Sequence, residues 1–112
     1  MQNLTSQDKK EIMKLRTLFP EKITVGVRRS EDGGFYAEIL LCPGCFTEGD
    51  TFSELIEMVN DAMMTYLEVP ERYISFMPNY LPPLSVAQEI GAFPVIDKEF
   101  KATFTTRERV KS

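Results

Sequence analysis

The strongest constraint on the fold is the stretch at residues 43–51, which runs directly into an amphipathic segment at residues 52–67. A Pro-Gly pair at its start ends an extended run, and Gly49 offers a second turn at positive φ. Thr51 and Glu54 then have the spacing of a capping box, which opens a helix by satisfying its first backbone N–H groups. The stretch therefore predicts a strand, a turn, a short strand, a second turn and a helix, in that order.

The segment at residues 52–67 is predicted to be the core helix. At about 100° per residue, an arc of about 140° holds most of its apolar side chains, which are Phe52, Leu55, Ile56, Val59, Ala62, Met63, Tyr66 and Leu67. An arc of this width is enough to seal one face of a sheet. Four carboxylates lie within about 60° of one line on the far side, with no lysine or arginine among them; they are Glu54, Glu57, Asp61 and Glu68.

Alternating apolar residues predict a β-hairpin before this stretch. The predicted strands are residues 22–29 and 35–41, and the turn between them, residues 30–34, has two glycines for positive φ. If Val27 pairs with Ala37 and Val25 with Ile39, the core faces of the two strands coincide. The hairpin thus supplies a sheet surface for the helix to cover.

The second predicted strand is apolar on both faces, because Tyr36 and Leu40 lie opposite the face of Ala37. The candidates for covering the second face are an N-terminal helix and another copy of the chain. We therefore expect a homodimer or a higher homo-oligomer. The expected interface residues are Tyr36, Leu40, Phe100 and Phe104.

Further elements are predicted on either side of the hairpin and helix. Residues 5–19 are expected to be a helix, opened by a capping box at Thr5 and Asp8 and ended by Pro20. Five of the seven prolines lie between residues 70 and 97, which keeps regular structure there short apart from a turn or two of helix at residues 85–91. An alternating segment at residues 100–106 reads as a strand.

The expected fold class is α+β, a three-stranded antiparallel sheet packed by one long amphipathic helix, with an added N-terminal helix and a C-terminal strand. At 112 residues, the chain has the length for one core. Its three parts are an N-terminal helical extension at residues 1–21, a β-β-β-α module at residues 22–70, and a Pro-rich connection with a C-terminal strand at residues 71–112, which belongs to the same domain.

Charge is strongly segregated along the chain, although the net charge is only -4. Residues 1–30 hold seven bases against three acids, whereas residues 31–71 hold ten acids and no base. A block of this kind repels phosphate and attracts cationic surfaces, so it favours a basic protein partner over nucleic acid. The acidic line on the helix also has a plain alternative reading as a solvated face.

The residues give little support for catalysis or for a cofactor. The chain has no histidine, and its two cysteines form one Cys-x-x-Cys at Cys42 and Cys45, away from a helix N-terminus. Structural thiols beside a turn are favoured over redox chemistry or a metal site, and no metal or other cofactor is expected. Carboxylates in a row along one helix diverge, whereas a metal needs oxygens that converge. A membrane span needs about 18 consecutive uncharged apolar residues, and no window of the sequence has them. We therefore expect a cytoplasmic protein.

The central motifs resemble the N-terminal module of HicB-like antitoxins over about residues 22–70. The matching positions, which we expect to be structural, are Gly34, Tyr36, Ala37, Pro43, Gly44, Cys45, Thr47, Gly49, Asp50 and Thr51. The resemblance implies a partial ribonuclease H-like fold. The metal cluster of that enzyme requires an acid in the first strand, and residues 22–29 contain none, so nuclease activity is not expected.

The resemblance also implies a partner, since HicB-like antitoxins bind and neutralise HicA, a small basic toxin that cleaves mRNA. The residues expected to face such a toxin from charge and geometry are Glu54, Glu57, Asp61 and Glu68. Members of the family usually carry a C-terminal DNA-binding domain, but the Phe-Pro-Val-Ile run at residues 93–96 leaves no room for a recognition helix, so DNA binding is not expected. The alternative hypothesis is an orphan HicB-like homo-oligomeric scaffold or accessory protein without a toxin.

Overall fold

A computed structural model describes residues 4–30, 32–85, 87–88 and 96–107 of the chain. Its helices are α1 (Ser6–Arg16), α2 (Phe52–Tyr66) and the 3-10 helix η1 (Glu71–Phe76). Its strands are β1 (Lys22–Arg29), β2 (Phe35–Ile39), β3 (Phe46–Gly49), β4 (Asn79–Leu81) and β5 (Ile96–Arg107). The class is α+β, as the sequence predicts. Helical residues also occur at 84–85 and 87–88, and the rest of the helix predicted at 85–91 lies outside the described residues.

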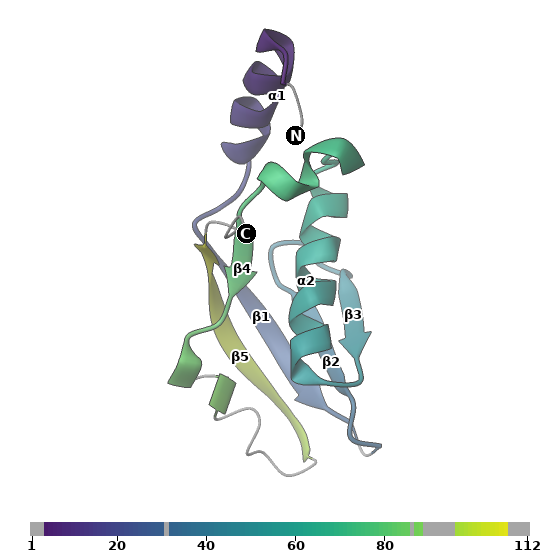
Figure 1. Cartoon of the computed structure of the whole chain (residues 1–112). Helices are drawn as coiled ribbons and strands as arrows, with labels where there is room; N and C mark the ends of the chain where they lie inside the picture. Colours follow the sequence, from purple (N-terminus) through teal and green to yellow (C-terminus); the bar gives the residue numbers. More distant parts are fainter. Residues whose placement is uncertain (1–3, 31, 86, 89–95, 108–112) are drawn as a thin grey trace.

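The sheet has five antiparallel strands in the order β3-β2-β1-β5-β4, which corrects the three strands expected from the sequence. The C-terminal strand is not an addition at the margin, because β5 pairs with β1 along most of its length and separates it from β4 (Figure 1). Most of these pairings join residues more than seventy positions apart in the chain. Local alternation predicts that a strand exists, but it does not show which distant strand will pair with it.

The hairpin of β1 and β2 has the predicted register, with Val27 opposite Ala37 and Val25 opposite Ile39. Only one of its two turn glycines has positive φ, namely Gly33 at 94°. The prediction of positive φ at Gly49 is also wrong. The other described glycine with positive φ is Gly44, at 88°.

Gly49 is required for a different reason, namely the close approach of β3 to α2. A Cβ atom built on Gly49 would lie 2.6 Å from the backbone N of Leu55, a distance that real Cβ contacts do not show. The Thr51 hydroxyl, two residues later, accepts a hydrogen bond from the Glu54 N–H at 3.0 Å and caps the helix. The short connection between β3 and α2 thus depends on the absence of a side chain at Gly49 and on the helix cap at Thr51.

The main core lies between α2 and one face of the sheet. Leu55, Val59 and Met63 of α2 are fully buried, as the apolar arc predicts, whereas Tyr66 from the same arc is 45% exposed. Phe104 of β5 is also fully buried in this core. Its expected place on an outer interface is therefore wrong, because alternation along β5 turns it toward α2.

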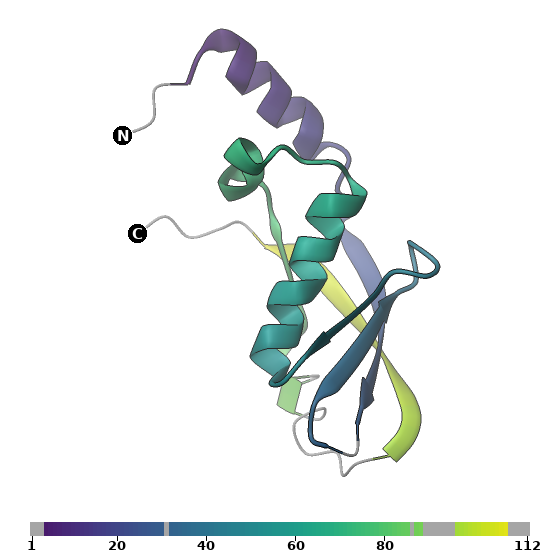
Figure 2. The same cartoon turned by 90° about the vertical axis from the view of Figure 1, so that its right-hand side faces the viewer.

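Helix α1 lies beyond one end of the sheet instead of covering its second face (Figures 1 and 2). It begins one residue later and ends earlier than predicted, and the capping box of Thr5 and Asp8 is formed. Ile12 of α1 is buried in a second cluster with residues from the end of α2, from η1 and from the turn after η1, which are Met64, Tyr73 and Met77. The first of the two expected covers for the outer sheet face is thereby removed.

The contact of α1 with η1 also has a polar component. The Tyr73 hydroxyl donates a hydrogen bond of 2.6 Å to the Asp8 carboxylate. This bond, followed by the bond from the Thr5 backbone, lowers the pKa of Asp8 below its ordinary value.

Cys42 and Cys45 are joined by a disulfide across the turn between β2 and β3, with their Cα atoms 5.4 Å apart. The free thiols expected at these positions are therefore replaced by a bonded pair. Their structural place beside a turn is as predicted.

Candidate functional site

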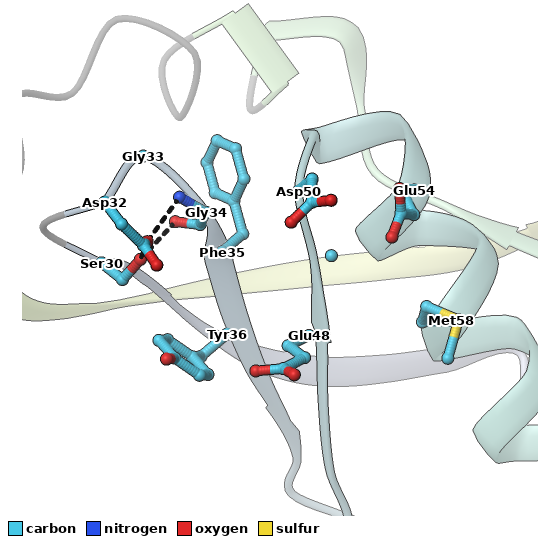
Figure 3. Close-up of a pocket in the computed structure, with 11 residues that line it drawn as sticks. Ser30, Asp32, Gly33, Gly34, Phe35, Tyr36, Glu48, Asp50, Glu54 and Met58 are labelled. Atoms are coloured by element: carbon cyan, nitrogen blue, oxygen red, sulfur yellow. Dashed lines mark hydrogen bonds between the residues drawn. The ribbon is translucent and has the colours of Figure 1, made fainter.

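An acidic hollow lies where β3 ends and α2 begins (Figure 3). It has a volume of about 650 Å³, and its walls come from the β1–β2 turn, the start of β2, the end of β3 and the first two turns of α2. Among the described residues, four carboxylates and no lysine or arginine line it. They are Asp32, Glu48, Asp50 and Glu54. We call this hollow the acidic groove.

Asp32 differs from the other three acids because its carboxylate belongs to the turn. It accepts hydrogen bonds from the Ser30 hydroxyl and from the Gly34 N–H, the latter at 3.1 Å (Figure 3). These two bonds, with the Ser30 bond the larger cause, hold the pKa of Asp32 below its ordinary value. Asp32 therefore stabilises the turn, while the exposed Glu48, Asp50 and Glu54 give the groove its negative charge toward solvent.

The four acids predicted to face a partner are all exposed, but they do not share one hollow. Glu54 lines the acidic groove. Glu57 and Asp61 instead line a smaller hollow of about 310 Å³ between α2 and β4. Glu68 lies beyond the end of α2, in the left-handed region with φ 55°. The predicted line of charge is thus divided between two flanks of the helix and its end.

Glu48 was missed by the sequence analysis, and Asp50 was treated only as a structural motif residue. A carboxylate on a four-residue strand carries no helical periodicity, so a search along the helix does not find it. The available signal was the base-free run itself, which contains Glu48 and Asp50 as well as the helix acids.

The outer sheet face, away from α2, carries exposed apolar side chains. Phe46 of β3 is 71% exposed and Tyr36 of β2 is 48% exposed, and Leu40 after β2 is also exposed. Tyr36 and Phe46 line a shallow hollow of about 440 Å³, together with Arg28. Two of the four predicted interface residues, Tyr36 and Leu40, therefore lie on this face. Phe104 does not, and the side chain of Phe100 lies outside the described part of the structure.

The chemistry available at these surfaces is that of charge and apolar contact. Among the described residues, no three histidine, cysteine, aspartate or glutamate side chains gather closely enough to hold a metal ion. In the same part of the chain, no helix combines the length and the apolar character needed to cross a membrane. The acidic groove suits a cationic group, since its carboxylates are exposed and outnumber the described basic side chains that line it.

The fold and these surfaces define a small α+β protein with an acidic groove at the end of an edge strand. The chain is 36% identical to a UPF0150 protein of Synechocystis over 55 residues, which are 46% of this chain and 70% of that protein. It is 35% identical to a UPF0150 protein of Archaeoglobus fulgidus, covering 43% and 70% of the two chains. It is 32% identical to a UPF0150 protein of Thermoplasma acidophilum, covering 51% and 83%. The chain therefore belongs to the UPF0150 family.

Two other comparisons found nothing. No family model matches the chain. No solved structure gives a significant match either.

Proposed function

We propose that this UPF0150 protein is a non-catalytic antitoxin of the HicB-like type. It binds a small basic toxin of the HicA type, which cleaves mRNA, and neutralises it by covering its cationic surface. The protein acts in the cytoplasm, where such a toxin meets its RNA, and it binds the toxin without a cofactor.

The observation that carries the proposal is the acidic groove together with the acidic flank of α2. Glu48, Asp50 and Glu54 are exposed at the groove, and Glu57 and Asp61 continue the charge along the helix. An RNA-binding toxin must present a positive surface to phosphate. An acidic surface complements that charge, which raises the association rate and favours this partner over neutral ones.

The HicB-like motif supports the proposal because its positions have structural roles around the groove. Gly34 lines the groove in the turn, Gly49 permits the close approach of β3 to α2, and Thr51 caps the helix that carries Glu54. The motif thus builds the place where the acids are displayed.

The test is binding of a HicA-type toxin encoded beside this gene, measured by calorimetry at about 0.15 M salt. The variant Glu48→Lys/Glu54→Lys reverses charge in the groove, and Glu57→Lys/Asp61→Lys reverses it on the other flank. We expect each pair to weaken binding by about tenfold or more, because each places a cation opposite a cationic toxin.

The matched control is Glu71→Lys, which makes the same change at an exposed acid of η1, away from both hollows. It should leave the toxin affinity within about threefold. Equal affinity for all of these variants, or no binding of the toxin by the wild-type chain, would refute the proposal.

The second candidate function is an orphan homo-oligomeric scaffold of the same family, without a toxin. It is favoured by the outer sheet face, where Tyr36, Leu40 and Phe46 are exposed together. Under this hypothesis, Tyr36→Ser/Phe46→Ser turns an oligomer into a monomer in light scattering and does so without a partner protein. A wild-type monomer at high micromolar concentration would exclude it.

A further inference from the structure

The two edges of the sheet are finished differently. At β4, the side-chain amide of Asn60 forms hydrogen bonds with both backbone groups of Tyr80. Its Nδ2 donates to the Tyr80 carbonyl at 3.0 Å, and its Oδ1 accepts from the Tyr80 N–H at 2.7 Å. The Asn60 amide therefore occupies the place that a neighbouring strand would take, and the middle of β4 is closed to another chain.

The hydrogen bonds of β2 show which groups of β3 face outward. The Ile39 N–H donates to the Cys45 carbonyl of the chain entering β3, and the Leu40 N–H donates to the Thr24 carbonyl on the β1 side. Odd-numbered residues of β2 thus bond toward β3, and even-numbered residues bond toward β1.

The register places Ala37 opposite Thr47 and Phe35 opposite Gly49 as bonded pairs. Phe46 and Glu48 lie at the alternate positions, so their backbone N–H and C=O groups point away from β2. β3 is the last strand on this side of the sheet in the described chain. Its outer edge therefore presents two donors and two acceptors.

This edge is also accessible. Figure 2 looks onto the edge of β3, with α2 on one side of the strand and the rest of the sheet on the other. The Phe46 side chain is 71% exposed. The acidic groove has walls from both sheet faces, since Tyr36 and Glu48 lie on the outer face while Glu54 and Met58 belong to α2 (Figure 3). The groove thus opens beside the end of β3.

We propose that the outer edge of β3 binds an extended basic segment of a partner protein by strand addition, as a sixth strand of the sheet. Backbone bonds to Phe46 and Glu48 hold the segment. Its side chains alternate between the two faces, so one set lies beside Glu48 and the other faces Glu54. Lysine or arginine at these positions then meets a carboxylate on each face.

Charge selects this occupant over a second copy of the chain. Antiparallel pairing of β3 with β3 of another copy would place the two Glu48 carboxylates on one face of the new sheet, directly opposite or diagonal to each other depending on the register. Like charges on adjacent strands destabilise pairing, and charges on an edge strand are a common defence against self-association. The same carboxylates attract a cationic strand, so they repel the chain itself and admit a basic partner.

The inference deepens the proposed function and rests on it for the identity of the partner. Its test uses the full chain and a probe peptide of about six residues, Lys-Lys-Val-Val-Lys-Lys, which places lysine on both faces of an added strand, and the same peptide with glutamate in place of lysine as control. We expect the lysine peptide to bind, and the glutamate peptide not to bind. The affinity should fall by about tenfold or more between about 0.05 and 0.5 M salt.

Amide hydrogen exchange measured by NMR gives the direct readout. In the unbound protein, the N–H groups of Phe46 and Glu48 should exchange much faster than those of Thr47 and Gly49. Saturation with the lysine peptide should slow Phe46 and Glu48 by at least about tenfold, because each N–H gains a bonded acceptor. If the Phe46 and Glu48 N–H groups are protected from exchange without peptide, and this protection increases with protein concentration, a second copy is the occupant and the proposal is overturned.

A pair of variants separates backbone pairing from side-chain contact. Phe46→Pro removes an outward N–H, whereas Phe46→Thr removes the same ring and keeps that donor. We expect the proline variant to bind the lysine peptide about tenfold more weakly than the threonine variant. Equal affinities would overturn strand addition, provided that both variants keep the wild-type circular dichroism spectrum.

The outcome for the toxin is separable from the outcome for the peptide. If Phe46→Pro binds the toxin as well as Phe46→Thr does, while Glu48→Lys/Glu54→Lys weakens binding, the strand-addition mode is wrong and the antitoxin proposal stands. If the peptide shows the expected pattern and no toxin binds, the antitoxin proposal is wrong and β3 is supported as a site for basic extended segments.

Discussion

The edges at β3 and β4 belong to one sheet but meet solvent in opposite ways. At β4, a buried asparagine from α2 bonds to both backbone groups of Tyr80. At β3, the acids Glu48 and Asp50 stand at or just after the strand, and its outward backbone groups have no such cover within the described chain. The helix that closes one edge also carries Glu54 beside the other.

The two edges show that an unpaired strand edge can be blocked against every partner or only against some partners. An open edge is a hazard because any strand can add to it. At β4, a side-chain amide blocks strand addition by any chain. At β3, carboxylates oppose pairing with another copy of the protein and leave the edge available to a cationic partner. Four experiments test whether the two edges differ in this way.

The largest expected effect is at the closed edge. Asn60→Leu keeps the volume of the side chain but leaves the Tyr80 N–H and C=O buried without their partners. We expect a loss of about 3 to 4 kcal/mol in the free energy of unfolding, measured by denaturant titration. Thr65→Leu, at an exposed position of the same helix, should change it by about 0.5 kcal/mol or less.

Asn60→Asp refines this test. A carboxylate still accepts from the Tyr80 N–H but cannot donate to the carbonyl, so the variant should be destabilised at neutral pH. Burial raises the pKa of such an aspartate, and its protonated form regains a donor. The deficit relative to wild type should therefore shrink as the pH falls; a deficit that is constant with pH would show that the donated bond is unimportant.

The next effect tests how β3 is held against α2. Gly49→Ala places a Cβ 2.6 Å from the Leu55 backbone N, and neither strand nor helix can yield easily. We expect a loss of about 2 to 3 kcal/mol in unfolding free energy. Gly34→Ala is the matched control, since its nearest contact is 3.4 Å and it should cost about 1 kcal/mol or less. Similar losses for both would disprove the close approach.

Alkaline pH should weaken the closed edge through Tyr80. Burial raises the pKa of its phenol from 10.0 to about 12, and the hydroxyl donates to the Pro20 carbonyl at 2.5 Å. The folded state holds this proton more tightly, so the stability is fully present below pH 10 and is lost as the pH rises toward 12. The loss should be about 1 to 2 kcal/mol. Tyr80→Phe should be less stable at neutral pH and lack this contribution to the slope.

The smallest expected effect is at the open edge. Phe46→Pro removes an N–H that points to solvent from an exposed position, so it should cost about 1 kcal/mol or less. Thr47→Pro removes an N–H that faces β2 and should cost about 3 kcal/mol or more. Reversal of this order in denaturant titration would show that the outward and inward positions of β3 are assigned the wrong way round.

Local patterns in the sequence predicted the hairpin and the helix well. The pairing of Val27 with Ala37 follows from two alternating runs joined by a short turn, and the burial of Val59 follows from helical periodicity. The caps at Thr5 and Thr51 likewise depend on neighbours within three residues. In each case the interacting groups are close in the sequence, so one local stretch of residues is enough to identify both of them.

The candidate site was predicted only in part. The base-free run indicated an acidic surface, and Glu54 does lie at the groove. Glu48 was not singled out, because its importance depends on β3 being an edge. Asn60 was also missed, since a polar residue on a helix gives no sign that a distant strand at Tyr80 will bond to it.

The class of the fold, the hairpin register, the core face of α2 and the negative charge of residues 31–71 all follow from local patterns in the amino-acid sequence. Tertiary structure decided that β5 lies beside β1, that Phe104 is buried, and that one edge is closed while the other is open. The physical reason is that strand order and edge cover arise from backbone and side-chain bonds between segments distant in the chain. Alternation and periodicity record which face of a segment is buried, but not which neighbour it meets.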